Sequence, residues 1–262
     1  MEIQKGTQYT GFAAVYDMFM DNVPYDKWAA YLHRLLKKYG VKNGIIAELG
    51  CGTGRMTRLL RDFGYDMIGI DVSGEMLQMA AETEKEGVAG EILYLNQDMR
   101  EFELYGTVAA IVSICDSMNY ITEKEDLLKV FRLAENYLDP GGVFIFDMNT
   151  SYYYKKILGE TTICDNREEG SLIWENYYDP ETKINEFDIT LYIRSDRKDR
   201  TDTYERFEET HYQRAYSVSE VRKLLEKAGL ANVRTYKAFT EDAPDSRTER
   251  VYFLAEKEKR NG

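Results

Sequence analysis

Three glycines at alternate positions are the residues of this chain whose spacing points most directly to chemistry. Gly50, Gly52 and Gly54 lie in the stretch ELGCGTG, between an apolar run at 45–49 and a helical pattern at 55–63. Glycine lacks Cβ, so the backbone there can adopt positive φ and lie against a ligand. The first turn of the following helix presents unpaired N–H groups. This arrangement predicts a site for a nucleotide-bearing cofactor.

Two carboxylates follow the next apolar runs. The run 66–71 ends in Asp71, about twenty residues after the glycines, where dinucleotide-type folds place an acid that accepts both ribose hydroxyls. The run 92–99 reads as a third strand and contains Asp98. Its carboxylate could accept a hydrogen bond from an exocyclic adenine amine, beside an apolar wall at Met99.

Two cofactor classes compete for this constellation. A nicotinamide site requires G-x-G-x-x-G, and counting from Gly50 and Gly52 its last glycine would stand where the chain has Arg55. The register is G-x-G-x-G instead, and a further acid follows the third strand. Both features argue against an NAD-dependent oxidoreductase.

Five ordered motifs resemble those of the class I S-adenosylmethionine-dependent methyltransferases. They are ELGCGTG at 48–54, IDVSGEML at 70–77, QDMR at 97–100, CDSMNY at 115–120 and LDPGGVFIFD at 138–147. The segment 12–17 and the fourth motif are also similar to a group of bacterial methyltransferases and to amino-sugar N-methyltransferases. The resemblance implies a Rossmann-like α/β fold, a seven-stranded sheet with helices on both faces, and S-adenosylmethionine as cofactor.

The resemblance also assigns cofactor contacts. The glycine loop would hold the methionine moiety, Asp71 the ribose, and Asp98 with Met99 the adenine. The expected cofactor-binding residues are Glu48, Gly50, Cys51, Gly52, Gly54, Asp71, Val72, Met76, Asp98, Met99, Cys115, Asp116 and Tyr16. Asp71 and Asp98 could instead cap the helices after them. We expect the two cysteines to be small apolar fillers, since no neighbouring cation argues for a thiolate.

The whole chain reads as a single methyltransferase domain, residues 1–262, in four parts. Residues 1–40 contain helical patterns at 11–20 and 25–39. In the resembled family such helices form a partial lid over the cofactor, which Tyr9, Phe12 and Tyr16 would face; the alternative is an amphipathic helix with its aromatics in the core. Residues 41–150 form the cofactor-binding core.

The periodicity of the apolar residues changes after residue 149. From about 161 to 214 apolar and polar residues alternate between turn signals at 169–170, 179–180 and 196–202, which predicts about four antiparallel strands inserted after the fifth strand, within 160–215. Residues 216–262 supply the last helix and two final strands. Capping boxes at 122–125 and 217–220 predict the starts of two helices, and residues 139–142 predict a turn.

The acceptor side is predicted from position and residue type. Asn119, Tyr120, Trp174 and Arg214 are the expected substrate contacts, and His211 and Tyr120 the candidate catalytic groups. His211 could be the general base that an alcohol or ammonium nucleophile needs, although a histidine on an alternating strand could equally have a structural partner. Because a sulfonium already carries a good leaving group, alignment of the nucleophile is the main requirement.

Composition excludes several other functions. The net charge of −12 opposes binding to a phosphate backbone, so no nucleic acid is expected, and three scattered cysteines with two histidines give no zinc set. The longest apolar run, 108–115, is far below the ~20 residues of a membrane span, and no export signal is seen. We expect a cytoplasmic protein acting on a small-molecule nitrogen or oxygen. A regulatory module that binds the cofactor without transferring its methyl group is the non-enzymatic alternative.

Overall fold

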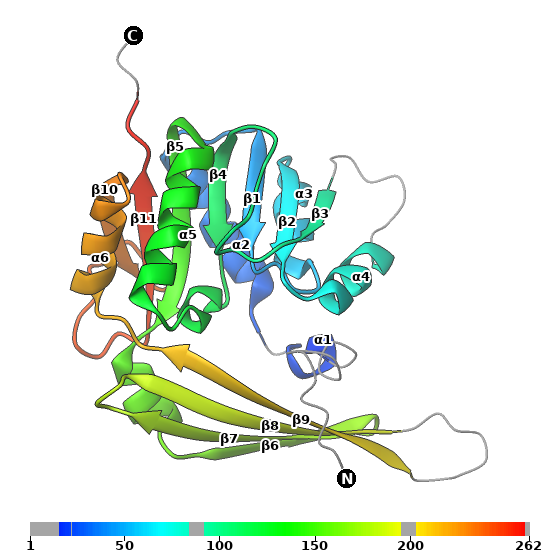
Figure 1. Cartoon of the computed structure of the whole chain (residues 1–262). Helices are drawn as coiled ribbons and strands as arrows, with labels where there is room; N and C mark the ends of the chain where they lie inside the picture. The colour runs from blue at the N-terminus through cyan, green and yellow to red at the C-terminus, as the bar shows by residue number, and fades with distance from the viewer. Residues whose placement is uncertain (1–15, 22, 84–91, 195–202, 260–262) are drawn as a thin grey trace.

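A computed structural model describes residues 16–21, 23–83, 92–194 and 203–259. The main sheet has seven strands in the order β10-β11-β5-β4-β1-β2-β3 (Figure 1). Their bounds are β1 Ile45–Leu49, β2 Asp66–Asp71, β3 Ile92–Asn96, β4 Val108–Ser113, β5 Leu138–Asn149, β10 Ala231–Lys237 and β11 Arg250–Glu256. All neighbours pair in parallel except at β11, which is antiparallel to both β10 and β5. The predicted seven-stranded α/β fold is confirmed.

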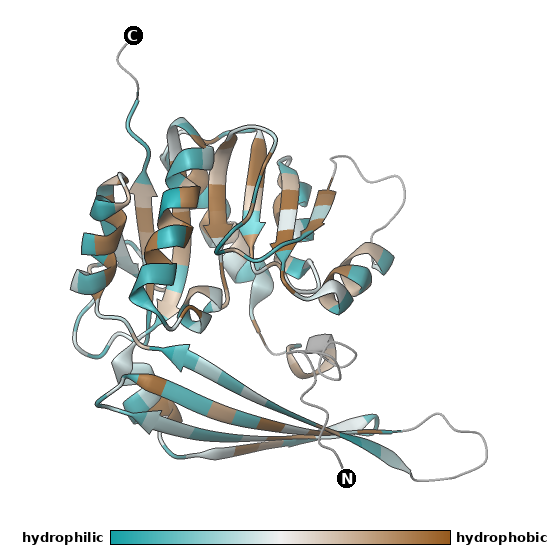
Figure 2. Cartoon of the chain, in the orientation of Figure 1, coloured by the Kyte–Doolittle hydropathy of each residue, from teal (hydrophilic) through white to brown (hydrophobic). Residues whose placement is uncertain are grey.

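Helices cover both faces of this sheet because its central strands are apolar on both sides. Along β5, Phe144 and Phe146 join a core with the helices α5 and α6, whereas Val143 and Ile145 join a second core with α2 and α3. Figure 2 shows the brown, hydrophobic strands between helices whose outer sides are teal. The helices are α1 Tyr16–Phe19, α2 Tyr25–Lys38, α3 Arg55–Asp62, α4 Gly74–Glu82, α5 Lys124–Tyr137 and α6 Val218–Lys227.

The inserted segment forms a second, antiparallel sheet of four strands, as predicted. These are β6 Thr162–Asn166, β7 Gly170–Asp179, β8 Ile184–Arg194 and β9 Tyr204–Arg214, and a π-helix at Tyr153–Leu158 precedes them. In Figure 1 the inserted sheet lies below the carboxyl ends of the parallel strands. Since ligands of open α/β sheets bind at that edge, the insertion encloses the region where a site is expected.

Several local predictions differ from the structure. The capping box at 122–125 is wrong: the N-cap of α5 is Glu123, whose side chain makes no capping bond, because the helix starts one residue later than the pattern indicates. The box at 217–220 is confirmed, with both reciprocal bonds between Ser217 and Glu220. The predicted turn 139–142 belongs to β5, since Gly141 N–H bonds the carbonyl of Lys257 beside it.

Two strands end earlier than the apolar runs indicated, so that Asp98 and Cys115 lie in the loops after β3 and β4. Of the first helical pattern, only 16–20 falls in the described residues; Tyr9, Phe12 and the side chain of Tyr16 lie outside them. No helix within the described ranges combines the length and apolar character needed to cross a membrane.

Candidate functional site

The glycine loop has the backbone that its sequence predicts. Gly50, Gly52 and Gly54 have φ of 72°, 53° and 72°, all in the left-handed region that favours glycine. A Cβ added at Gly50 would stand 2.7 Å from the hydroxyl oxygen of Ser117. At Gly50 the loop therefore forms a narrow backbone cradle that a side chain would fill. Gly54 also serves as the N-cap of α3.

Asp71 fixes this loop against β2. Its Oδ2 accepts a hydrogen bond from the backbone N–H of Gly52 at 2.8 Å, and its Oδ1 accepts from that of Ser73 at 2.9 Å. The N-cap of α4 is Ser73, so the alternative of Asp71 as a helix cap does not hold. Burial raises the pKa of this carboxyl, and hydrogen bonds from the backbone N–H groups of Ser73, Gly52 and Val72 partly offset the rise. Each oxygen keeps a lone pair that can accept a ribose hydroxyl.

Glu48 and Cys51 lie beneath the loop. Burial raises the pKa of Glu48 to about 8, although the hydroxyl of Thr57 donates to its carboxyl group. Burial likewise raises the pKa of the Cys51 thiol, with the neighbouring carboxylates adding to the effect. A thiol held in its neutral form is a poor nucleophile, and this agrees with the prediction that Cys51 is a small apolar side chain that fills space.

Asp98 carries its own counter-ion. Its carboxylate accepts from the backbone N–H of Arg100 at 2.8 Å and from the guanidinium Nε at 3.0 Å, and these bonds lower its pKa. Both residues line the same cavity as Met99. Arg100 was not among the predicted site residues, although it belongs to the same motif as Asp98.

The chain leaves β4 through two consecutive non-glycine residues in the left-handed region. Cys115 has φ of 64° and Asp116 has φ of 53°, conformations that cost of order 1–3 kcal/mol each and that cluster at functional sites. The turn is held because the backbone N–H of Asp116 donates to Asp147 Oδ1 at 2.9 Å. It places the Asp116 carboxylate in the cavity lining, at the end of β4, which neighbours β1 where the strand order reverses.

A buried ion-pair network holds that carboxylate. Arg250 donates to Asp147 Oδ2 at 2.7 Å and to Asp116 Oδ1 at 2.8 Å, and its guanidinium carbon lies 5.3 Å from the ring centre of Trp28. Gln213 Nε2 donates to Asp116 Oδ2 at 2.7 Å. Asp147 is fully buried. Arg250 and Gln213 were not among the predicted site residues, since neither belongs to a motif.

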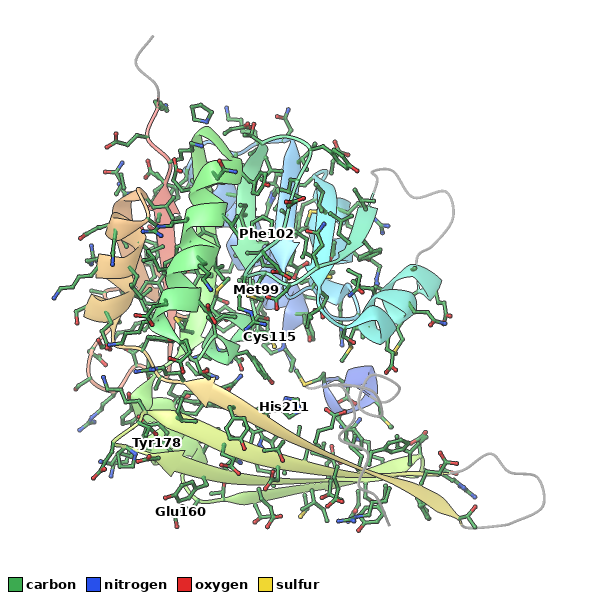
Figure 3. All side chains as sticks on the ribbon, viewed as in Figure 1. Met99, Phe102, Cys115, Glu160, Tyr178 and His211 are labelled. Carbon is green, nitrogen blue, oxygen red and sulfur yellow. The ribbon has the colours of Figure 1, made fainter. Side chains whose placement is uncertain are left out.

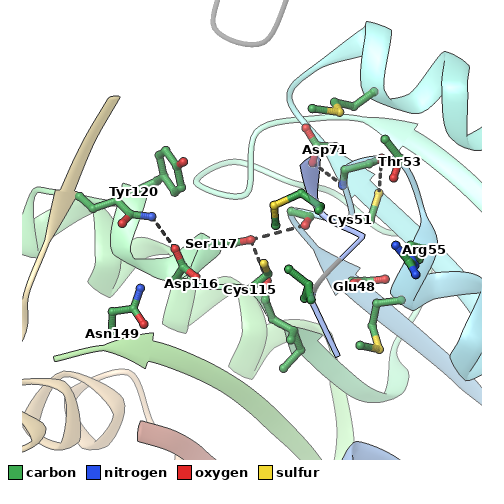
Figure 4. A pocket seen from close by; sticks show the side chains of 18 of the residues that line it. Glu48, Cys51, Thr53, Arg55, Asp71, Cys115, Asp116, Ser117, Tyr120 and Asn149 are labelled. Atoms are coloured by element: carbon green, nitrogen blue, oxygen red, sulfur yellow. Dashed lines mark hydrogen bonds between the residues drawn. The ribbon is translucent and has the colours of Figure 1, made fainter. Parts of the chain in front are cut away.

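These residues line a cavity of about 760 Å³ that runs from the glycine loop to the inserted sheet. In Figure 4, Asp116, Tyr120 and Asn149 gather on one side, and Glu48 and Asp71 on the other. The predicted cofactor-binding residues that line the cavity are Glu48, Gly50, Cys51, Gly52, Asp71, Val72, Met76, Asp98, Met99, Cys115 and Asp116. Gly54 lies outside this lining.

Two of the predicted substrate contacts line the cavity, Tyr120 and Trp174, and two do not. Asn119 is fully buried: its amide nitrogen donates to the carbonyls of Asn149 and Arg214, and its amide oxygen accepts from the N–H of Asn149. Arg214 donates to the carbonyl of Thr122 at 2.8 Å. Both side chains join the inserted sheet to the main fold.

His211 is fully buried on the inserted sheet and is absent from the described cavity lining. Its Nε2 lies 3.1 Å from Glu209 Oε2, its ring stacks on Phe187 with centres 5.1 Å apart, and Tyr120 meets it edge-on at 5.8 Å. Figure 3 shows it on the side of β9 that faces the main sheet, toward Cys115. These contacts are typical of a histidine with a structural role, and its role as a general base stays a prediction. In the described part of the chain, no His, Cys, Asp and Glu side chains group as a metal site.

The fold and the site together are those of an α/β methyltransferase that binds a nucleotide-bearing cofactor. Comparison with known proteins agrees with this class. Residues 46–142 match the family described as a methyltransferase domain. The chain is 34% identical over 252 residues to a protein of Bacillus subtilis (strain 168) named "Putative methyltransferase YqeM", covering 96% of this chain and 98% of that one. A Geobacillus sp. (strain WCH70) protein, also named a putative methyltransferase, is 32% identical over 251 residues, which is 95% of this chain and 99% of that one.

Solved structures agree. An S-adenosylmethionine-dependent methyltransferase from Clostridium acetobutylicum ATCC 824 superposes with a TM-score of 0.82 at 27% identity, over 96% of this chain and 100% of that one. The sugar N-methyltransferase KedS8 from Streptoalloteichus sp ATCC 53650 shares the fold, with a TM-score of 0.74 at 16% identity over 99% of each chain. The chain belongs to the S-adenosylmethionine-dependent methyltransferases, and its cofactor is S-adenosylmethionine. The glycine cradle and the Asp71 carboxylate fit that cofactor.

Proposed function

We propose that this methyltransferase methylates an amine nitrogen of a small molecule held between the main sheet and the inserted sheet. The observation that carries the proposal is the Asp116 carboxylate, fixed at the strand-order reversal where the cofactor half of the cavity meets the inserted sheet. Five carboxyl residues and three arginines line the cavity. Burial keeps one of the five, Glu48, protonated near neutral pH, and the other four still outnumber the arginines. The chain's net charge of −12 also attracts cations.

A second hydrogen-bond acceptor lies near Asp116. Asn149 is buried and lines the cavity, and its Oδ1 has no hydrogen-bond partner in the described structure. It stands two residues after Asp147 on β5, so both side chains leave the same face of the strand. A primary amine has two N–H groups to give to Asp116 and Asn149, whereas a hydroxyl has one O–H. Two acceptors therefore favour nitrogen over oxygen.

These contacts would also direct the reaction. The cofactor supplies a methyl group bonded to a sulfonium sulfur. The ammonium form would first lose one proton to solvent water. With both remaining N–H groups held, the nitrogen lone pair points away from Asp116 and Asn149, and such alignment can supply about 7–11 kcal/mol of the barrier. In-line attack would form the N–C bond as the S–C bond breaks and would leave the positive charge on nitrogen. The Asp116 carboxylate would stabilise that charge until the nitrogen releases a proton to solvent water.

The relatives support nitrogen as the acceptor atom. A Streptomyces venezuelae protein named as an N,N-dimethyltransferase of a dTDP-amino sugar is 28% identical over 139 residues, which is 52% of this chain and 56% of that one. The structural neighbour KedS8 is titled a sugar N-methyltransferase.

Methyl-labelled S-adenosylmethionine and a small-molecule extract of bacterial cells test the proposal. We expect label in compounds that a cation exchanger retains, as N-methyl groups. Asp116→Asn should lower the labelling rate about 10- to 100-fold, because a charge-assisted hydrogen bond is lost. Asp188→Asn, on the exposed face of the inserted sheet, is the matched control and should leave the rate unchanged. Label only in neutral O-methyl compounds, or tight cofactor binding with no labelled product, would refute amine methylation.

A further inference from the structure

Trp174 carries a buried hydrogen-bond donor without a partner in the described structure. Its indole ring lines the cavity from β7, and its Nε1 is inaccessible to solvent and unpaired. Buried donors in folded proteins are almost always bonded, since an unpaired one has lost its water without replacement. Where a folded protein keeps an unpaired donor in the wall of a cavity, a ligand or an ordered water can supply the partner. The indole nitrogen therefore points to a partner that the bound state supplies.

The neighbours of Trp174 cannot be that partner. In the strand register it lies between Ile163 and Ile189, which also line the cavity, and the Phe187 ring is 5.4 Å away. These side chains are apolar and have no hydrogen-bond acceptor atoms.

The nearest carboxylates on this face of the inserted sheet are engaged elsewhere. Asp165 pairs with Arg167 at 2.8 Å, and Glu209 lies 3.1 Å from the ring nitrogen of His211. The indole N–H of Trp174 is thus a polar group in an otherwise apolar part of the cavity wall, where it can contact a bound molecule. Its chemistry is that of a donor only, which fixes the partner as a hydrogen-bond acceptor.

We propose that Trp174 Nε1–H binds a neutral oxygen of the methyl acceptor, so that the substrate is an amine whose carbon skeleton also carries a hydroxyl, ether or carbonyl oxygen. The inference rests on the proposed amine methylation and adds the second point of recognition. Asp116 and Asn149, at the edge of the main sheet, hold the reacting nitrogen, and Trp174, on the inserted sheet, holds the oxygen. An anionic oxygen is disfavoured because Asp116 and Asp165 line the same cavity.

Two probes that differ by one hydroxyl test this assignment: trans-4-aminocyclohexanol and cyclohexylamine, each titrated into the ¹⁵N-labelled protein saturated with S-adenosylhomocysteine. The chain has two tryptophans, so its indole N–H signals are assigned with Trp28→Phe and Trp174→Phe. We expect the amino alcohol to bind about three- to tenfold more tightly than the plain amine, the effect of one neutral hydrogen bond. The Trp174 N–H signal should move downfield with the amino alcohol and much less with cyclohexylamine.

The preference should disappear in Trp174→Phe, which keeps an aromatic ring and removes the donor. Tyr177→Phe, on the exposed face of the same strand, removes a hydroxyl outside the cavity and should keep the preference. Equal affinities in the unmodified protein, a preference that survives Trp174→Phe, or a Trp174 signal that neither probe moves would overturn the proposal. These are binding measurements: a lasting preference without methylated product from any amine would instead refute the proposed function.

Discussion

Gln213 on β9 and Asp116 after β4 join the inserted sheet to the main sheet through one hydrogen bond. Gln213 Nε2 donates to Asp116 Oδ2 at 2.7 Å, and the buried hydroxyl of Tyr154 donates to Gln213 Oε1 at 2.8 Å, which fixes the orientation of the amide. The position of the Asp116 carboxylate therefore depends on both sheets. The insertion encloses the acceptor and also takes part in placing the group that we propose binds it.

Gln213→Leu should consequently affect the acceptor and spare the cofactor. We expect the acceptor KM to rise about tenfold, the effect of one hydrogen bond to a charged group, with the affinity for S-adenosylhomocysteine unchanged. Steady-state kinetics and titration calorimetry measure the two quantities. Gln78→Leu, an exposed change on α4, is the control. An equal loss of cofactor affinity would show that Gln213 supports the whole fold rather than Asp116.

Asp71→Ala should weaken cofactor binding by more than about 1 kcal/mol, because charge-assisted hydrogen bonds to the ribose and the bond to Gly52 are lost together. Calorimetry with S-adenosylmethionine measures the change. Glu75→Ala removes an exposed carboxylate four residues later and should leave the dissociation constant as it is. An unchanged affinity in Asp71→Ala would show that the ribose lies elsewhere.

Glu48 makes stability depend on pH. Its pKa is about 8 in the folded chain, against about 4.3 for a free glutamate, so the folded state holds the proton more tightly. Its contribution to stability is full below pH ~4 and is lost as the pH rises through about 8. The Tm of the wild type should therefore fall between pH 5 and about 8.5 relative to Glu48→Gln. Parallel Tm curves over that range, measured by calorimetry, would contradict this protonation state.

Arg250→Met should destabilise the protein by about 3–5 kcal/mol, because Asp147 is fully buried and would lose its counter-ion. Urea unfolding measures the effect. Arg234→Met is the control, since its pair with Glu256 lies at the surface, with side chains 42% and 26% exposed, and such pairs are worth about 0–1 kcal/mol. Comparable losses in both variants would argue against a buried network at Asp116.

Local sequence patterns predicted the two sheets and the glycine loop, because the conformation of each is determined mainly by residues that are close in the sequence. Glycines at alternate positions permit positive φ whatever surrounds them, and all three glycines of the loop adopt it. The change from helical to alternating periodicity at residue 149 marks the insertion. The N-cap of α5 shows the limit of such patterns: Thr122 has the right spacing, but the helix begins after Glu123.

The part of the site that would bind the methyl acceptor is formed by tertiary contacts, which local sequence patterns do not reveal. Arg250 and Asp116 are 134 residues apart in the chain, and each belongs to the site only because β11 and β4 flank β5. Residue type and position favoured His211 as a general base and Asn119 as a substrate contact. Both side chains are buried and hydrogen-bonded within the protein, His211 to Glu209 and Asn119 to backbone carbonyls. Trp174 was predicted to contact the substrate because it lies on a strand of the insertion. That its indole nitrogen has no hydrogen-bond partner in the described structure follows only from the folded cavity wall.

A crystal structure with S-adenosylhomocysteine and trans-4-aminocyclohexanol tests the central claim most directly. We predict the adenosyl group between the glycine loop and Asp71, with the amine nitrogen within hydrogen-bond distance of both Asp116 and Asn149 and facing the sulfur atom. An adenosyl group bound away from Asp71, or an amine held by neither of the two acceptors, would contradict the account.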